Sequence, residues 1–218
     1  ILGLATAAGI LYMSFLNTGS TNNAYYSSII ALVGVFVGYF YTAKPIRLSS
    51  RYGLGELSIF LSFGPLLTLG TGFAISNETI QLYSNEFYNL LLLGIPIGLL
   101  TTNILFINQY PDYASDKKVG KNHLVVLLGK KASRWIYGLN LILALGSLYF
   151  IAENILIGTK QMLFIYILIP ITMFYSYFLL SGLFKYYNSR KLIKYNIHTI
   201  YFHMLFSFIY MIILANFQ

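Results

Sequence analysis

The chain has 218 residues, of which 57% are hydrophobic and only 9% are charged, and its formal net charge is +8. A soluble domain carries roughly 25% charged residues, so this composition excludes an ordinary soluble fold and indicates an integral membrane protein. The sequence has no cysteine, which excludes disulfides, thiolate metal sites and a cysteine nucleophile.

Apolar segments follow one another along the chain and predict an all-α, polytopic transmembrane helical bundle of seven helices in a single domain, residues 1–218. A hydrocarbon core of roughly 30 Å is crossed by about 20 helical residues, which satisfy their own backbone hydrogen bonds. The predicted helices cover residues 1–16, 24–43, 54–75, 88–108, 134–152, 162–184 and 196–217. The first is short and the chain starts at Ile1 rather than methionine, so we expect further residues before it.

Basic residues are concentrated in alternate connections between these segments. The connections 44–53, 109–133 and 185–195, together with Arg134, hold all of the 14 lysines and arginines except Lys160. Positive residues remain on the cytoplasmic side of a membrane, so these three connections are predicted to face the cytoplasm of a multi-pass cell-membrane protein. Topology and contacts with anionic membrane lipids therefore explain the positive charge, and no nucleic-acid partner is expected.

The long connection contains three oxygen-bearing side chains at a spacing of four. Asn108, Asp112 and Asp116 would share one face of a helix, although Pro111 favours a helix start or kink between them. One or two carboxylates, with water and substrate phosphates, are the usual ligands of Mg²⁺. The spacing therefore predicts a Mg²⁺ site where a membrane helix meets water.

Lysines follow these acids directly. Lys117, Lys118 and Lys121 would suit a polyanion such as diphosphate beside the metal. The alternative is that Asp112 and Asp116 are ordinary solvated loop acids paired loosely with these lysines. Against it, they are two of only six acidic residues, and the only two in any basic connection.

The pattern NxxxDxxxD, followed by Gly120 and Lys121, resembles the second aspartate-rich motif of the UbiA superfamily of intramembrane prenyltransferases. A second stretch, residues 41–71, resembles the cytoplasmic loop and following helix of menaquinone-type members, which prenylate dihydroxynaphthoate. Its GLGE at Gly53 to Glu56 and its FGPL at Phe63 to Leu66 carry that likeness. The resemblance covers nearly the whole chain.

The resemblance implies a fold of nine transmembrane helices around a cavity, of which this chain would supply helices three to nine. It also implies that two aspartate-rich motifs hold Mg²⁺ on the diphosphate of a polyprenyl donor. An allylic cation then forms and is attacked by an aromatic acceptor, here a quinone precursor. A bound dication would stabilise the negative charge that develops on the leaving diphosphate.

Site residues follow from the same resemblance. Asn108, Asp112 and Asp116 inherit the metal and diphosphate role, which makes the two aspartates the catalytic candidates. Lys121 occupies the basic position after the motif glycine, and Lys117 lies beside the motif.

Further substrate-binding candidates lie outside the motif. Tyr41, Lys44 and Arg47 fall in the loop that covers the active site in the family, although the two cations are equally explained by topology. Glu56 opens a helix, where an acid is favoured at the N-terminus, or it serves in acceptor binding or proton removal. Asn103 is a buried amide that would line the cavity.

The chain departs from the family pattern in several places. Its first acidic residue is Glu56, so the first aspartate-rich motif is expected before Ile1, in two further helices. His123 replaces a usual threonine and would be either a neighbour of the metal ligands or, more commonly for a loop histidine, a solvated residue. Leu127 replaces a usual arginine. In the last segment, His198 and His203 are expected to form interhelical hydrogen bonds.

Other functions remain open at this point. A lipid- or haem-directed prenyltransferase would share the motif, and a non-catalytic UbiA-like subunit of a larger membrane complex would share the fold. A transporter is less well supported, because transporters place charges or broken helices at the bilayer midplane, whereas the charges here lie at the segment ends.

Overall fold

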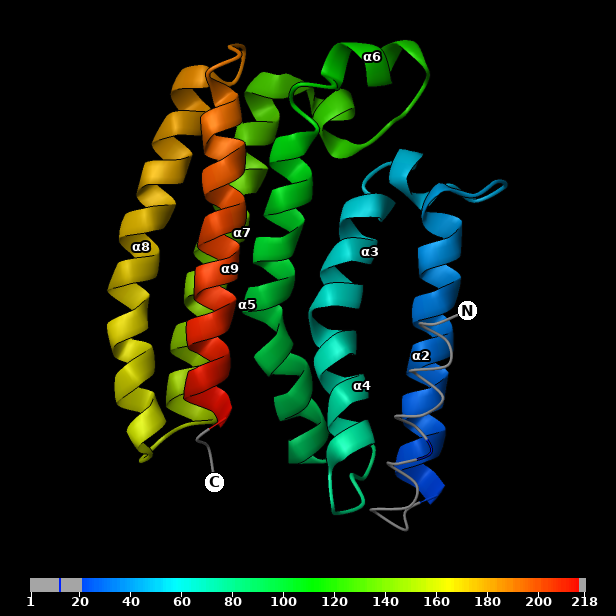
Figure 1. The fold of residues 1–218 in the computed structure, drawn as a ribbon, viewed down its shortest axis with the longest axis vertical. Coiled ribbons are helices and arrows are strands. Elements are labelled where there is room, and N and C mark those ends of the chain that lie inside the picture. The colour runs from blue at the N-terminus through cyan, green and yellow to red at the C-terminus, as the bar shows by residue number, and fades with distance from the viewer. Residues whose placement is uncertain (1–11, 13–20, 216–218) are drawn as a thin grey trace.

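A computed structural model describes residue 12 and residues 21–215 of the chain, and this part is a bundle of long helices without a strand (Figure 1). The helices are α2 (Thr21–Thr42), α3 (Leu54–Phe63), α4 (Pro65–Ile75), α5 (Asn85–Asn108), α6 (Tyr113–Lys118), α7 (Leu124–Asn154), α8 (Lys160–Tyr186) and α9 (Leu192–Ala215). Within residues 21–215, six helical stretches are long and apolar enough to cross a membrane. The all-α prediction is confirmed, while the predicted helix 1–16 lies outside the described residues, apart from Tyr12.

The third predicted segment is two helices rather than one. The helix breaks at Gly64, whose backbone angles are φ −117° and ψ −108°, and α4 begins at Pro65. Proline has no amide hydrogen to donate, so it suits the first position of a new helix and interrupts a continuing one. Residues 54–75 are predominantly apolar, so hydropathy predicted one continuous helix and gave no sign of this break.

The helix α7 starts within the connection that was predicted to run from residue 109 to 133. It begins at Leu124 and bends at Gly129, where φ is 78° and ψ is 153°. The short α6 occupies the same connection. Hydropathy missed these turns because Lys130 and Lys131 interrupt the apolar run at the end of the bundle.

The helix α5 lies in the middle of the bundle, between α3 and α4 on one side and α7 and α9 on the other (Figure 1). Its side chains Leu100, Phe106 and Ile107 are buried in the main core together with Tyr137 and Leu141 of α7. The C-terminal end of α5 therefore holds a fixed position among the other helices, and the polar segment follows it directly.

Both histidines of the last helix form the interhelical hydrogen bonds that were predicted. The Nε2 of His203 lies 2.8 Å from the hydroxyl of Thr101 on α5. The Nδ1 of His198 lies 2.9 Å from the hydroxyl of Tyr175 on α8. Such pairs satisfy polar groups within an apolar bundle and fix the contact between helices.

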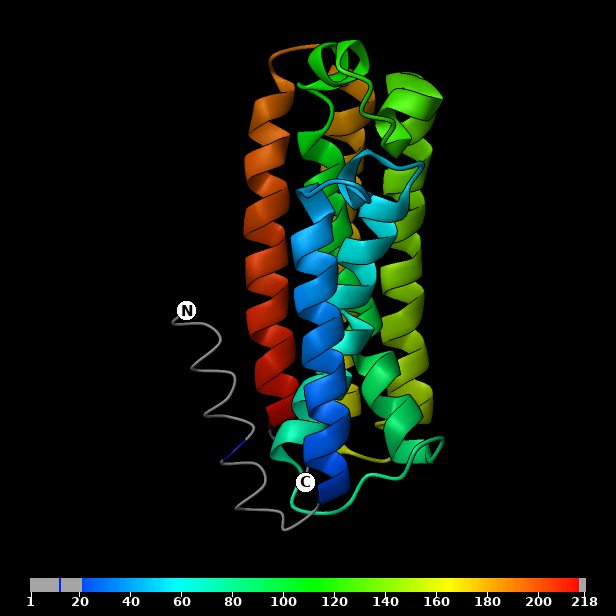
Figure 2. The same ribbon diagram turned by 90° about the vertical axis from the view of Figure 1, so that its right-hand side faces the viewer.

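The connections fall into two groups at opposite ends of the bundle (Figures 1 and 2). The loop after α2, the segment around α6 and the turn between α8 and α9 lie at one end. The α4–α5 and α7–α8 connections lie at the other. The three connections rich in lysine and arginine are thus at one end, as their alternation along the sequence predicted.

Candidate functional site

Two basic connections that are distant in sequence are joined by backbone hydrogen bonds. The amide of Tyr52 donates to the carbonyl of Asn122 over 2.8 Å, and the amide of Asn122 donates to the carbonyl of Ser50 over 3.2 Å. The loop after α2 is thereby held against the loop after α6. Residues of both predicted motifs therefore share one end of the bundle.

Asp116 lies on α6 and is engaged by side chains from the loop that follows it. Its Oδ1 accepts from the Nζ of Lys121 at 2.8 Å. Its Oδ2 lies 3.2 Å from the Nε2 of His123. Each carboxylate oxygen carries about two lone pairs, so both oxygens retain capacity for another ligand.

His123 is buried rather than solvated, with only 2% of its surface exposed. It occupies the N-terminal cap of α7, where its Nδ1 accepts from the amide of Val126 at 3.4 Å. In the neutral ring this leaves the hydrogen on Nε2, directed at Asp116. His123 thus orients Asp116, and its place directly before an apolar run was the sequence signal for a helix cap.

Asn108 and Asp112 lie on either side of a break between two helices. The helix α5 ends at Asn108, and α6 begins at Tyr113 with Asp112 at its N-terminal boundary, so Pro111 does mark a new helix start. Asp112 is exposed and its side chain forms no cap. Asn108 turns towards α9, where its Oδ1 accepts from the Nδ2 of Asn196 at 3.2 Å.

The acidic side chains fit a partial metal site rather than a complete one. No group of three or more His, Asp or Glu side chains is placed to hold a metal within the part of the chain that the structure describes. The exposed carboxylate of Asp112 and the spare lone pairs of Asp116 are suitable ligands for a hard cation. Mg²⁺ commonly takes its remaining ligands from water and substrate phosphate, so these residues fit it.

The predicted cations differ in what surrounds them. Lys117 lies 5.8 Å from the ring centroid of Tyr113, a cation–π contact on α6 itself. Lys44 is exposed, and Arg47 is half-buried in a left-handed conformation with φ 48°. Tyr41 is half-buried at the end of α2. Their substrate-binding roles stay predictions.

Glu56 connects three helices at this end of the bundle. It lies in the first turn of α3, as expected, and its side chain is buried with 4% exposure. Its Oε1 accepts from the Nε2 of Gln109 and from the amide of Leu124, each over 3.0 Å. Sequence analysis did not single out Gln109, because its partner lies far away in the chain.

Asn103 has the partners that a buried amide in a membrane requires. Its Nδ2 donates to the carbonyl of Tyr137 at 3.1 Å, and its Oδ1 accepts from Asn140 at 2.9 Å. These bonds join α5 to α7 and account for its burial, and its substrate-binding role stays a prediction.

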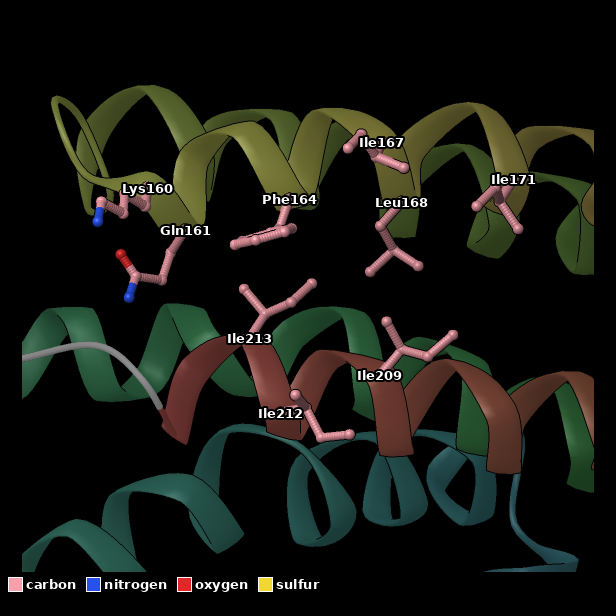
Figure 3. A pocket seen from close by; sticks show the side chains of 9 residues that line it. All are labelled: Lys160, Gln161, Phe164, Ile167, Leu168, Ile171, Ile209, Ile212 and Ile213. Atoms are coloured by element: carbon pink, nitrogen blue, oxygen red, sulfur yellow. The ribbon is translucent and has the colours of Figure 1, made fainter.

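A cavity of about 580 Å³ lies between α8 and α9, at the end opposite the aspartates (Figure 3). Its lining is apolar, with Phe164 and several isoleucines, apart from Lys160 and Gln161 at its edge. Side chains from both helices point into the space between them (Figure 3). Because this cavity is apolar and lies at the opposite end of the bundle from Asp112 and Asp116, it is not the candidate site.

The chain matches the family model described as the UbiA prenyltransferase family over residues 1–212. It is 33% identical over 126 residues to a 2-carboxy-1,4-naphthoquinone phytyltransferase of Synechocystis, covering 57% of this chain and 37% of that protein. It is 30% identical over 112 residues to a 1,4-dihydroxy-2-naphthoate octaprenyltransferase of Bacillus subtilis, covering 51% and 33%. The Escherichia coli protein of the same name is 35% identical over 107 residues, covering 49% and 30%.

These matches cover about a third of the length of each of these relatives. No solved structure matches the chain. The family suggested by the aspartate motif is confirmed. Two of these relatives are named as dihydroxynaphthoate prenyltransferases, the branch that the GLGE and FGPL stretches resembled.

Proposed function

Because this chain belongs to the UbiA prenyltransferase family, we propose that it transfers a polyprenyl group from its diphosphate to an aromatic quinone precursor within the membrane. Relatives named for a carboxynaphthoquinone or a dihydroxynaphthoate acceptor support this acceptor class. The observation that carries the proposal is the pair Asp112 and Asp116 beside Lys121, at the end of a family helix bundle.

The donor diphosphate is assigned to the polar end of the bundle. Asp112, Asp116 and Asn108 would hold Mg²⁺, which supplies positive charge to the departing diphosphate. Lys121 lies 2.8 Å from Asp116 and provides a fixed cation beside the same group. Lys117, Lys44 and Arg47 are further cations at this end, and Tyr41 is close to them in sequence.

We place this end of the bundle on the cytoplasmic side of the cell membrane. The support is the charge asymmetry, since every lysine and arginine except Lys160 belongs to the connections at the α6 end or to the first turns beside them. A diphosphate made in the cytoplasm would then reach the aspartates without crossing the bilayer.

The test is a transfer assay on purified full-length protein in detergent. With Mg²⁺, labelled geranylgeranyl diphosphate and 1,4-dihydroxy-2-naphthoate, we expect a labelled, prenylated product. Chelation by EDTA should abolish its formation, and added Mg²⁺ should restore it. No transfer to this acceptor, to a lipid or to haem would contradict the proposal and favour a non-catalytic subunit of a complex.

Replacing His123 by phenylalanine should lower the apparent affinity of the transfer reaction for Mg²⁺. The change removes the hydrogen bond that orients Asp116, and partners of metal ligands typically affect metal affinity by about 10- to 100-fold. We expect the Mg²⁺ concentration for half-maximal transfer to rise about 10-fold. Glu78→Gln, at an exposed acid of the opposite end, is the control, and an unchanged Mg²⁺ dependence in the His123 variant would refute the positioning role.

A further inference from the structure

One oxygen of the Glu56 carboxylate has no partner among the described residues. Oε1 accepts two hydrogen bonds, but Oε2 is fully buried and accepts none. The Oε1 of Gln109, the residue that donates to Glu56, is buried and unpartnered as well. Buried acceptors are almost always satisfied, because losing water without a replacement is costly. Two unsatisfied acceptors on adjoining side chains indicate a missing donor.

Glu56 also lines a cavity between α3, α5 and α7, with a volume of about 260 Å³. Apolar side chains form most of its lining, among them Phe60, Leu99 and Phe106. Thr102 is the hydroxyl-bearing residue of this lining. Ligand pockets are typically mostly apolar and orient the ligand through a small number of polar groups, which here are Glu56, Thr102 and Asn140. The cavity therefore suits an aromatic ring that carries a hydrogen-bond donor.

The cavity and the aspartate site meet at the first turn of α7. Leu124 lines the cavity and donates its amide to Glu56. The preceding residue, His123, contacts Asp116. The first residue of α7 and its cap therefore face two different sites, one apolar with a carboxylate and one suited to a diphosphate.

We propose that this cavity receives the aromatic acceptor, and that the Glu56 carboxylate then turns its Oε2 into the cavity to accept a hydrogen bond from a hydroxyl group on the ring. This assignment rests on the proposed prenyl transfer. A hydroxyl supplies the donor that Oε2 lacks, and the ring fills the space beside Phe60 and Phe106. A saturated acyl chain would fill the same space but leave the carboxylate unsatisfied.

The wild-type protein tests the proposal through two probes that differ only in the donor. 1-Naphthol carries a hydroxyl, and 1-methoxynaphthalene replaces its hydrogen with a methyl group. Binding to the full-length protein in lipid nanodiscs is followed by naphthalene fluorescence, with empty nanodiscs subtracted. Hydrogen bonds to charged groups typically change affinity by about 10- to 100-fold, so we expect 1-naphthol to bind at least about 10-fold more tightly. Equal affinities would overturn the proposal.

Glu56→Gln identifies the atom responsible. Glutamine keeps an oxygen for Gln109 and Leu124, and presents an amide donor where Oε2 was. The preference for 1-naphthol should disappear, while the KM for the prenyl diphosphate should stay unchanged. Glu86→Gln, at an exposed acid on the opposite end, should keep the preference. A preference that survives in Glu56→Gln, or equal weakening of both probes, would contradict the assignment to Oε2.

Failure of this inference is distinguishable from failure of the proposed function. If the protein prefers 1-naphthol but transfers no prenyl group, the binding site is supported and the proposed reaction is contradicted. If the protein transfers the prenyl group but binds both probes equally, the proposed reaction is supported and the acceptor site at Glu56 is contradicted.

Discussion

Replacing Asp116 by asparagine is expected to lower the rate of prenyl transfer by about 100-fold or more, because several kcal/mol of leaving-group stabilisation depend on the metal. The change removes the charge of one of the two motif aspartates and leaves Lys121 without its carboxylate partner at 2.8 Å. Asparagine has nearly the same shape, so the loss should reflect charge rather than packing. Initial rates with saturating acceptor and a series of Mg²⁺ concentrations measure the effect.

The matched variants separate a metal role from general damage. Asp112→Asn should cause a loss of similar size. Its exposed carboxylate forms no helix cap, so such a loss would not be explained by destabilisation of α6. Glu78→Gln removes an acid of the opposite end and should leave the rate unchanged. If Asp116→Asn transferred the prenyl group at the wild-type rate, neither the metal role nor the catalytic role of this residue would stand.

Local pattern was sufficient to indicate the aspartate segment as a candidate site, but not to predict which residues hold it in place. The spacing of Asn108, Asp112 and Asp116 is a property of neighbouring residues, and so is the charge of Lys121. The orientation of Asp116 depends on His123, whose burial follows from where α7 begins. The apolar run that begins α7 is short, and Lys130 and Lys131 separate it from the next apolar segment, so hydropathy alone left this start in the connection.

Contacts between distant segments were the least predictable part of the site. Glu56 reaches Gln109 and Leu124, which are 53 and 68 residues away in the chain. A single sequence does not indicate such long-range hydrogen bonds, because each of these residues is also compatible with a local role in its own helix. For Glu56 the local expectation of a place in the first turn of α3 was correct, yet its carboxylate serves the start of α7.

The helix break at Gly64 shows why apolar composition predicts a span but not its shape. The break brings the backbone of Gly64 against Gly94 and Gly98 of α5, where a side chain on any of the three would meet backbone atoms. Glycines four apart allow this close approach between membrane helices. Composition counts these residues as neutral, although their position fixes how α3 and α4 cross α5.

Replacing Gly94 by alanine is therefore expected to destabilise the bundle by about 1–3 kcal/mol, the usual cost of overpacking a tight contact. A Cβ there would lie 2.5 Å from the carbonyl carbon of Gly64 and 2.5 Å from the Oγ1 of Thr68. The Thr68 hydroxyl could rotate away, but the contact with the backbone of Gly64 cannot be relieved by a rotamer change. The midpoint of thermal unfolding, followed by size-exclusion chromatography in detergent, should fall by about 2–10 °C.

A matched glycine on α7 decides whether packing is the cause. A Cβ on Gly146 would meet no atom of the described residues within 4 Å, apart from its own helix and neighbours. Alanine favours a helix over glycine by about 1 kcal/mol, so Gly146→Ala should leave the midpoint unchanged or raise it. The same helix propensity favours alanine at Gly94. A lower unfolding midpoint for Gly94→Ala would therefore be caused by the close backbone contact and not by helix propensity. If Gly94→Ala were as stable as Gly146→Ala, α4 and α5 would not be in backbone contact at this position.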